Sequence, residues 1–193
     1  MLRGCKFFLW LFLSLLWSIR AAHGKDDFLP EATLKSAVPI PMVALDIAKL
    51  TKVASADQDT LWILDKIRRE NGEAAVRFRT LDAEGDQEAG IIFRYTDPKN
   101  YYAVVGNAQE EKCSLYRVTD GSWKMEGSQD AIITPLTWHE LRVIYSPERV
   151  TAILDGQLTL GIKMSTVKSA GRVGLWARVG SRVSFDKFQI SRP

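Results

Sequence analysis

The sequence is poor in the residue types that build metal centres, disulfides and nucleophilic active sites. Of 193 residues, only two are cysteine and two are histidine. Cys5 and His23 lie within the first 24 residues, which resemble a leader, so the rest of the chain keeps only Cys113 and His139. A structural zinc site needs about four cysteine or histidine ligands, and a single cysteine cannot form an internal disulfide. We therefore expect no metal, no cofactor and no covalent cross-link within the domain.

The same scarcity limits nucleophilic catalysis. A Ser-His-Asp or Cys-His arrangement would have to use His139, but this residue lies in Trp138-His-Glu-Leu-Arg-Val143, a pattern typical of a strand. We expect His139 to be structural. Cys113 precedes another strand and is expected to be unpaired and inert, the alternative being an intermolecular disulfide in an oxidising compartment.

The first 24 residues have the pattern of a secretory signal peptide. Basic residues precede an apolar run over residues 7–19, and the small residues Ala22 and Gly24 follow it. The run is shorter than the roughly 20 residues that a helix needs to cross a bilayer. Because Arg20 interrupts the run just before the small residues, an uncleaved anchor is the alternative. We expect cleavage after Gly24 and a secreted or periplasmic protein with no membrane contact beyond the export signal.

Without the leader, the chain has no net formal charge when histidine is neutral. The chain has 26 lysines and arginines against 23 aspartates and glutamates, and Arg3, Lys6 and Arg20 belong to the leader. Nucleic acids and anionic membrane surfaces both attract clustered positive charge, so neither is an expected partner. The local basic cluster at residues 66–69 is followed at once by Glu70, which predicts a solvated face in a segment that could form a helical turn.

No internal repeat or low-complexity tract divides the rest of the chain, which predicts one domain. Residues 25–42 contain Pro30, Pro39 and Pro41. Because proline opposes both helices and central strands, we expect an irregular N-terminal arm there. Residues 43–193 then form the domain, which is long enough to bury one core without cross-links.

Period-two alternation recurs along this domain, and no long 3.6-residue period competes with it. Apolar and polar side chains alternate over residues 76–79, 141–145 and 150–154, which predicts half-buried strands. The pairs Asp120-Gly121 and Asp155-Gly156 stand between such runs and tolerate the positive φ of tight hairpins. The pattern predicts an all-β fold.

The segment from residue 89 to residue 107 predicts a hairpin. Asp97-Pro98-Lys99-Asn100 is a turn with proline at its second position, so residues 89–95 and 101–107 should pair in antiparallel fashion. Near the C-terminus strict alternation fails at Asp186-Lys187, which predicts a β-bulge. Regularly spaced short strands, some of them apolar on both faces, favour a two-sheet antiparallel sandwich of the jelly-roll type.

Turn glycines and strand-end aromatics follow a fixed order along residues 43–190. The motifs are Gly90–Tyr95, Asp97-Pro98, Asn100-Tyr-Tyr102, Asn107-Ala108, Leu115–Val118, Asp120-Gly121, Trp138–Val143, Leu154–Gly156, Gly171–Trp176 and Phe185-Asp186. This series resembles the concanavalin A-like jelly rolls and, more narrowly, the 3-keto-disaccharide hydrolase domains, which are similar to family-16 glycosidases. The resemblance implies a sandwich with a concave face that binds or cleaves glycans in many relatives.

The sequence from Glu84 to Glu88 matches the Glu-x-Asp-x-Glu spacing of family-16 glycoside hydrolases, with Asp86 at its centre. In those enzymes a strand points the three carboxylates into one cleft. Here Gly85 and Gln87 give the segment the composition of a loop. A carboxyl group in a solvated loop is not desolvated, so its pKa is not raised as a general acid requires. We therefore expect Glu84, Asp86 and Glu88 to be weak candidates for catalysis.

Aromatic and polar side chains that could share one sheet face are better candidates for a ligand site. Sugars present apolar C–H faces ringed by hydroxyls, which flat rings and hydrogen-bonding groups recognise together. The candidates are Arg94, Tyr101, Asn107, Glu110, Tyr116, Trp176 and Arg178. Core or edge packing is the alternative for the aromatic residues, and an ion pair with Glu110 or Asp186 is the alternative for Arg94. Trp62, Trp123 and Trp138 are expected to be structural.

The sequence thus predicts an exported, non-catalytic jelly-roll module that binds a glycan or another surface ligand. A glycoside hydrolase acting on a disaccharide or a modified sugar is the first alternative. A structural or protein-interaction module, which would dock a partner through a sheet edge or through the proline-containing arm, is the second.

Overall fold

The computed structural model describes residues 41–53, 59–85, 87–165 and 169–191. Contacts between Cα atoms divide the chain into two units, 1–35 and 36–193, and all of the described residues belong to the second. The expected leader, nearly all of the expected arm and Asp86 lie outside the described residues. Among the residues that are described, no helix is long and apolar enough to cross a membrane.

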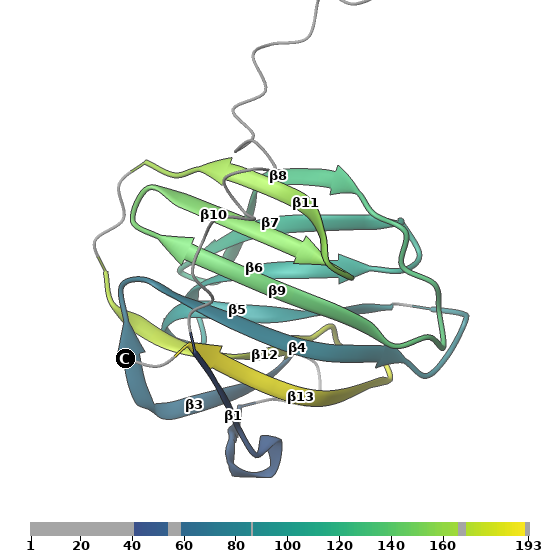
Figure 1. Ribbon diagram of the computed structural model, residues 1–193, viewed down its shortest axis with the longest axis horizontal. Coiled ribbons are helices and arrows are strands. Elements are labelled where there is room, and N and C mark those ends of the chain that lie inside the picture. Colours follow the sequence, from purple (N-terminus) through teal and green to yellow (C-terminus); the bar gives the residue numbers. More distant parts are fainter. Residues whose placement is uncertain (1–40, 54–58, 86, 166–168, 192–193) are drawn as a thin grey trace, which may run out of the picture. The chain divides into compact units, whose positions relative to one another are not determined.

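The domain is a sandwich of two antiparallel sheets, as predicted (Figure 1). The six-stranded sheet has the order β1 (Met42–Ala44), β13 (Val183–Ser191), β4 (Gly72–Thr80), β9 (His139–Ser146), β10 (Arg149–Leu154) and β11 (Gln157–Lys163). The seven-stranded sheet has the order β2 (Thr51–Val53), β3 (Thr60–Arg69), β12 (Gly171–Ala177), β5 (Glu88–Asp97), β6 (Asn100–Asn107), β7 (Lys112–Thr119) and β8 (Ser122–Asp130). A short 3₁₀ helix, η1 (Ile47–Lys49), links β1 to β2.

Two local predictions are confirmed and one is wrong. β5 and β6 form the predicted hairpin, closed by the pair Asp97 and Asn100. The β13–β4 register shifts between Asp186 and Gln189, where Lys187 has φ 51°, which is the predicted bulge. Residues 66–71 do not form a helical turn, because β3 extends through residue 69 and its end pairs with the start of β12. Strand pairing here overrides the local helical preference.

The inner faces of both sheets form one hydrophobic core. Phe78 of the six-stranded sheet and Phe93 of the seven-stranded sheet are fully buried in it, together with Tyr145. Cys113 also lies in this core without a disulfide partner. Burial raises the pKa of its thiol to about 12, so the side chain is protonated and unreactive at neutral pH.

The seven-stranded sheet carries a second hydrophobic cluster on its other face. The cluster draws only on strands of this sheet, and its members alternate along each strand with the residues of the inner core. In β5, for example, Ile91 and Phe93 join the inner core, whereas Ile92 joins the second cluster. We call the face that holds this second cluster the outer face of the seven-stranded sheet.

Candidate functional site

A row of aromatic rings crosses the outer face of the seven-stranded sheet. The ring centroids of Tyr95 and Tyr101 are 6.1 Å apart, and those of Tyr101 and Trp123 are 5.9 Å apart. Trp123 in turn lies 5.5 Å from Trp176 and 5.3 Å from Tyr116. These residues come from β5, β6, β7, β8 and β12, so strand pairing fixes their order. We call them the aromatic strip.

The rings of the strip differ in how far solvent can reach them. Trp176 is fully buried, and Tyr95 and Tyr101 are nearly so, whereas Tyr116 and Trp123 are half-buried. Burial raises the pKa of the Tyr101 and Tyr116 hydroxyls, so both remain protonated donors at neutral pH. The indole Nε1 of Trp176 forms no well-aligned hydrogen bond within the described chain, although it lies near the Tyr101 hydroxyl. The rings of the strip that solvent reaches are therefore those of Tyr116 and Trp123.

A polar group is fixed beside the exposed end of the strip. Arg178 donates from Nε and Nη2 to Glu88 Oε2, at 3.1 and 3.0 Å, and Asn107 Nδ2 donates to Glu88 Oε1 at 2.9 Å. The guanidinium carbon of Arg178 also lies 5.7 Å from the Trp123 ring centroid and 5.4 Å from that of Trp176. Two donors on one carboxylate oxygen and two aromatic contacts restrict the orientation of the Arg178 guanidinium. The group therefore presents donors and acceptors at fixed positions next to the half-buried rings.

Two further carboxylates lie close to this polar group. Asp59 Oδ2 is 3.9 Å from Arg178 Nη1, and Asp59 Oδ1 accepts a hydrogen bond from the Val179 backbone at 3.0 Å. Asn107 Oδ1 accepts from the backbone N–H of Gln109 and of Glu110, both at 2.9 Å, which fixes the turn that carries Glu110. The Glu110 carboxylate is near enough to Tyr116 to add to the increase in its pKa that burial causes.

The opposite end of the strip also has an arginine–carboxylate pair. Arg172 Nη1 donates to Asp65 Oδ1 at 2.7 Å, and its guanidinium carbon lies 5.0 Å from the Tyr95 ring centroid. The Thr51 hydroxyl donates to the same carboxylate, and this bond, followed by that from Arg172, lowers the pKa of Asp65. Arg172 of β12 and Arg178, which directly follows β12, are thus each paired with a carboxylate and packed on aromatic rings.

Residues 43–191 match the family of 3-keto-alpha-glucoside-1,2-lyase-like domains. The chain belongs to this family. The family predicted from the order of motifs is therefore confirmed. No curated protein matches the sequence.

Solved structures share the sandwich fold of this 3-keto-alpha-glucoside-1,2-lyase-like domain. The carbohydrate-binding module CBM66 from Bacillus subtilis has a TM-score of 0.65 at 16% identity, over 78% of this chain and 95% of the module. A B. subtilis protein of unknown function with a galectin-like fold has a TM-score of 0.57 at 9% identity, over 84% of this chain and 91% of that one. At these identities the likeness shows the fold.

A larger protein contains the same fold as one part of its chain. A GH43 protein from Bacillus licheniformis has a TM-score of 0.51 at 15% identity, over 69% of this chain and 29% of that protein. The lyase-like domain therefore corresponds to less than a third of the chain of that GH43 protein.

All but one of the candidate ligand residues lie together at one end of the outer face. Tyr101, Tyr116 and Trp176 belong to the aromatic strip, and the remaining polar candidates, Asn107, Glu110 and Arg178, surround its exposed end. This arrangement follows from the β6–β7 hairpin and from the return of β12 next to β5. Their contact with a ligand stays a prediction.

Arg94 is the exception, because its side chain does not join the strip. It has φ 50° and is 2% exposed, and its guanidinium carbon lies 5.8 Å from the Tyr102 ring centroid, a ring of the inner core. Its Nη2 donates to the Glu70 carbonyl at 3.2 Å, an interaction that neither Glu110 nor Asp186 provides. Burial lowers the pKa of Arg94. Gly171 is required beside it, since a Cβ there would be 2.2 Å from the Arg94 backbone.

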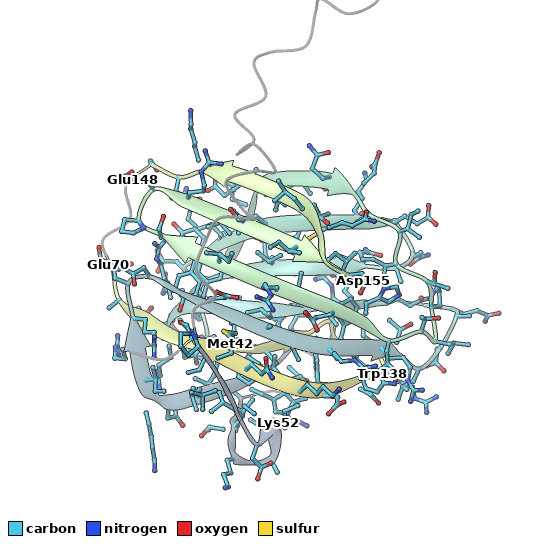
Figure 2. The ribbon with its side chains drawn as sticks, viewed as in Figure 1. Met42, Lys52, Glu70, Trp138, Glu148 and Asp155 are labelled. Atoms are coloured by element: carbon cyan, nitrogen blue, oxygen red, sulfur yellow. The ribbon has the colours of Figure 1, made fainter. Side chains whose placement is uncertain are left out.

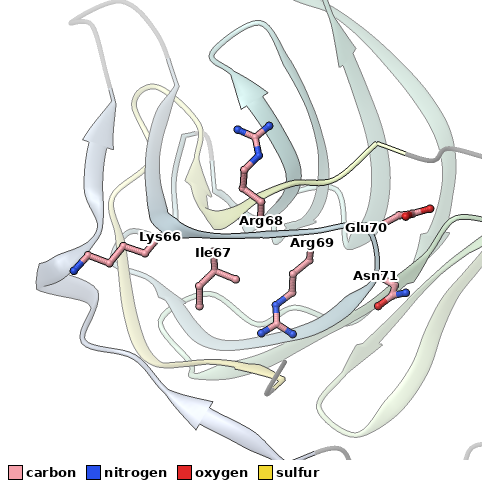
Figure 3. A pocket seen from close by; sticks show the side chains of 6 residues that line it. All are labelled: Lys66, Ile67, Arg68, Arg69, Glu70 and Asn71. Atoms are coloured by element: carbon pink, nitrogen blue, oxygen red, sulfur yellow. The ribbon is translucent and has the colours of Figure 1, made fainter.

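The basic cluster singled out in the sequence lines a surface pocket next to Arg94's hydrogen-bond partner. The pocket has a volume of about 410 Å³ and is bordered by residues 66–71 (Figure 3). Figure 3 shows Ile67 and Arg69 on one side of the strand and Arg68 on the other. Arg68 Nη2 donates to the Ala170 carbonyl at 3.5 Å. The pocket lies outside the aromatic strip.

The carboxylates of the Glu-x-Asp-x-Glu match do not lie on one strand. Glu88 is the first residue of β5, whereas Glu84 is exposed in the preceding bend, and Asp86 is outside the described residues. In the part of the chain that is described, no three His, Cys, Asp or Glu side chains cluster closely enough to hold a metal ion. Glu88 belongs instead to the polar group around Arg178.

Sequence reasoning missed two members of the site. The sequence predicts a structural role for Trp123, and its packing agrees with that role, but the sequence does not predict that Trp123 contacts three rings of the strip and the Arg178 guanidinium. Asp59 precedes β3 and gives no motif of its own. The signal for Trp123 was available in its parity, since it pairs with Val118, which shares a face with Tyr116.

His139 has the structural role that the sequence predicts. Its Nδ1 lies 2.6 Å from Asp155 Oδ2 and its Nε2 lies 3.0 Å from the Thr134 carbonyl oxygen, so both ring nitrogens face protein oxygens. The ring is 6% exposed and packs 5.9 Å from the Phe78 ring. His139 therefore joins β9 to the loop before it and to the β10–β11 turn.

Proposed function

We propose that this protein binds a neutral saccharide, without catalysis, at the exposed end of the aromatic strip. The observation that carries the proposal is the contact of Arg178, which is bonded to Glu88, with the Trp123 ring, on which the Tyr116 ring packs. Half-buried rings offer flat apolar area for the C–H face of a sugar, while the adjacent polar side chains offer donors and acceptors for its hydroxyls. The fold shared with the carbohydrate-binding module from B. subtilis supports the same function.

The charges at the site favour a neutral ligand. Arg178 is already paired with Glu88 and lies near Asp59, so its charge is matched. Lys112, the other cation of this region, is opposite Asn107 in the β6–β7 register and opposite Asp130 in the β7–β8 register. Because each of these described cations has a carboxylate beside it, an acidic sugar would gain little and would meet repulsion from Glu110.

The bonding of Glu88 supports binding over acid catalysis. A general acid must hold a proton near neutral pH, which requires a desolvated carboxyl group without a cationic partner. Both oxygens of Glu88 instead accept charge-assisted or amide hydrogen bonds, two of them from Arg178. This geometry stabilises the ionised carboxylate and leaves Glu88 as an acceptor for ligand hydroxyls.

A glycan array probed with the full chain tests the proposal. We expect weak, saccharide-selective binding by the wild-type protein that is lost in Trp123→Ala and reduced in Tyr116→Ala. Trp138→Ala is the matched control for neutral glycans only, because Trp138 contacts Arg77 and Arg79 of the six-stranded sheet and lies outside the aromatic strip. Thermal unfolding followed by circular dichroism identifies variants that fail to fold. Absence of binding to any glycan would overturn the proposal and favour a protein-interaction module.

A second candidate function is turnover of a 3-keto-glucoside, which the family match favours. Elimination across C1 and C2 of such a sugar needs a base within hydrogen-bond reach of the C2 proton, which the neighbouring ketone makes acidic. Asp59 and Glu88, which both pair with Arg178, are carboxylates beside the strip that could serve. Release of the leaving group from a 3-keto-alpha-glucoside, lost in Asp59→Asn or Glu88→Gln, would establish this activity in place of binding alone.

We also propose that the protein works outside the cytoplasm. The support is the pattern of the first 24 residues, with an apolar run followed by Ala22 and Gly24. N-terminal sequencing of the exported protein should begin at Lys25. A protein that keeps residues 1–24 and stays in the cytoplasm would contradict this proposal without affecting the binding site.

A further inference from the structure

Trp138 and two arginines form a cluster on the six-stranded sheet, far in the topology from the aromatic strip. The guanidinium carbons of Arg77 and Arg79 lie 5.0 and 4.9 Å from the ring centroid of Trp138. Val76 and Phe78, which alternate with these arginines in β4, belong to the inner core, so the arginines point outward. Figure 2 shows Trp138 near the end of β4, beside the start of β9. Stacking on the indole restricts both guanidinium groups.

The register places the two arginines in different surroundings. Arg77 pairs with Asp186 of β13 and with Glu140 of β9, and the Asp186 carboxylate is 3.8 Å from Arg77 Nη1. Arg79 pairs with Ser184 of β13, and on its other side stands the indole ring that precedes β9. Carboxylates thus flank Arg77 on both neighbouring strands, whereas the cross-strand neighbours of Arg79 are Ser184 and the indole of Trp138, neither of which is a carboxylate. An incoming anion is repelled at the first arginine and attracted at the second.

Arg79 has an unused capacity to donate hydrogen bonds. Of the arginine side chains in the described ranges, that of Arg79 alone makes neither a hydrogen bond nor an ion pair, and its Nε is buried without a partner. The two Nη atoms of Arg79 are not among the buried atoms, so a ligand can accept hydrogen bonds from them without breaking a bond within the described residues. The planar guanidinium fork fits the paired oxygens of a carboxylate or a sulfate group.

We propose that Arg79, Trp138 and Ser184 form a second ligand site, which binds an acidic saccharide through its carboxylate or sulfate group. The anionic group accepts hydrogen bonds from Arg79, the Ser184 hydroxyl donates a further one, and the sugar ring packs beside the Trp138 indole. Ser184 is half-buried and directly opposite Arg79, so its hydroxyl is within the same row. This site would select for charge, whereas the aromatic strip on the other sheet selects against it.

Equilibrium titration of the full chain with tetragalacturonate, maltotetraose and sodium sulfate tests the proposal. We expect tetragalacturonate to bind with an affinity that falls as salt rises, and the neutral tetrasaccharide to bind at most at the aromatic strip. Arg79→Gln should weaken tetragalacturonate binding roughly tenfold or more, as loss of a charge-assisted hydrogen bond predicts. Trp138→Leu should also weaken it and should remove the associated change in tryptophan fluorescence.

Arg182→Gln is the matched control, because Arg182 is exposed and already paired with Asp82 at 3.0 Å. It should leave tetragalacturonate binding unchanged. Trp123→Ala should remove neutral-sugar binding and leave acidic-sugar binding intact, so failure at one site is distinguished from failure at the other. The proposal is overturned if Arg79→Gln binds tetragalacturonate as well as the wild type does, or if inorganic sulfate at equal concentration displaces or matches it.

Discussion

The outer faces of the two sheets are built by the same alternation of side chains, but one face buries apolar side chains and the other buries charged ones. On the seven-stranded sheet the outer residues include Trp176, Ile92 and Ala103, all fully buried. On the six-stranded sheet the corresponding positions hold charged residues such as Glu73, which is 6% exposed and pairs with Arg142 at 2.7 Å. The seven-stranded sheet is therefore stabilised by apolar burial on both faces, and the aromatic strip is also part of the fold.

Because of this difference, the expected effects of a substitution on ligand binding and on stability are coupled on one face and largely independent on the other. Substitutions in the aromatic strip remove both ligand contact and apolar packing, whereas substitutions around Trp138 remove surface contacts that the core does not need. Matched substitutions on the two faces should therefore give effects of different size.

The largest contrast is expected between the two tryptophans. Trp176→Ala removes a fully buried ring and should cost about 3–5 kcal/mol of unfolding free energy, as large-to-small core substitutions do. Trp138→Ala removes a half-buried ring that contacts two arginines, and should cost about 1 kcal/mol or less. Urea denaturation of both variants measures the difference. Equal costs would show that the strip is not a second core.

A smaller contrast is expected between the ion pairs of the two faces. Arg142→Ala leaves the buried Glu73 carboxylate without its cation and should cost about 1–3 kcal/mol. Asp65→Asn acts on a pair whose carboxylate is exposed, and should cost less than about 1 kcal/mol. The midpoints of chemical unfolding test this order. A larger loss in Asp65→Asn would contradict the expectation that the buried pair of the six-stranded sheet contributes more to stability.

The smallest effect is a dependence of stability on acid pH. Hydrogen bonds from Thr51 and then from Arg172 lower the pKa of Asp65 in the folded protein. Its contribution to stability is therefore complete above the ordinary aspartate pKa of about 3.9 and is lost as pH falls through the lowered folded value. Stability of Asp65→Asn should vary less with pH below about 4 than that of the wild type. Asp120→Asn, which removes an exposed turn carboxylate without a hydrogen bond among the described residues, should retain the wild-type slope.

Much of the fold follows from the sequence because its determinants are local. The Asp97–Asn100 turn and the loss of alternation at Asp186-Lys187 each predict a feature that the structure contains. The extension of β3 through residue 69 could not be predicted in the same way, because it depends on pairing with β12, about a hundred residues later in the chain.

The candidate site was predictable as a set of residue types but not as a full geometry. Parity along β6 and β7 places Tyr101 and Tyr116 on one face, so their meeting is encoded locally. The position of Arg94 is not, since its positive φ within the β5 irregularity turns the side chain towards the inner core. The pairing of Arg178 with Glu88 depends on which strand β12 joins, and alternation alone leaves that choice open.

The most direct test of the account is the nuclear magnetic resonance spectrum of the tryptophan indole N–H groups during titration with the neutral glycan selected by the array. Residues 25–193 contain four such groups, from Trp62, Trp123, Trp138 and Trp176, which single substitutions to phenylalanine can assign. The account predicts that the Trp123 signal shifts most and that of Trp176 shifts with it, while the Trp138 and Trp62 signals stay in place. Shifts confined to Trp138, or unchanged signals for Trp123 at saturation, would contradict a saccharide site on the outer face of the seven-stranded sheet.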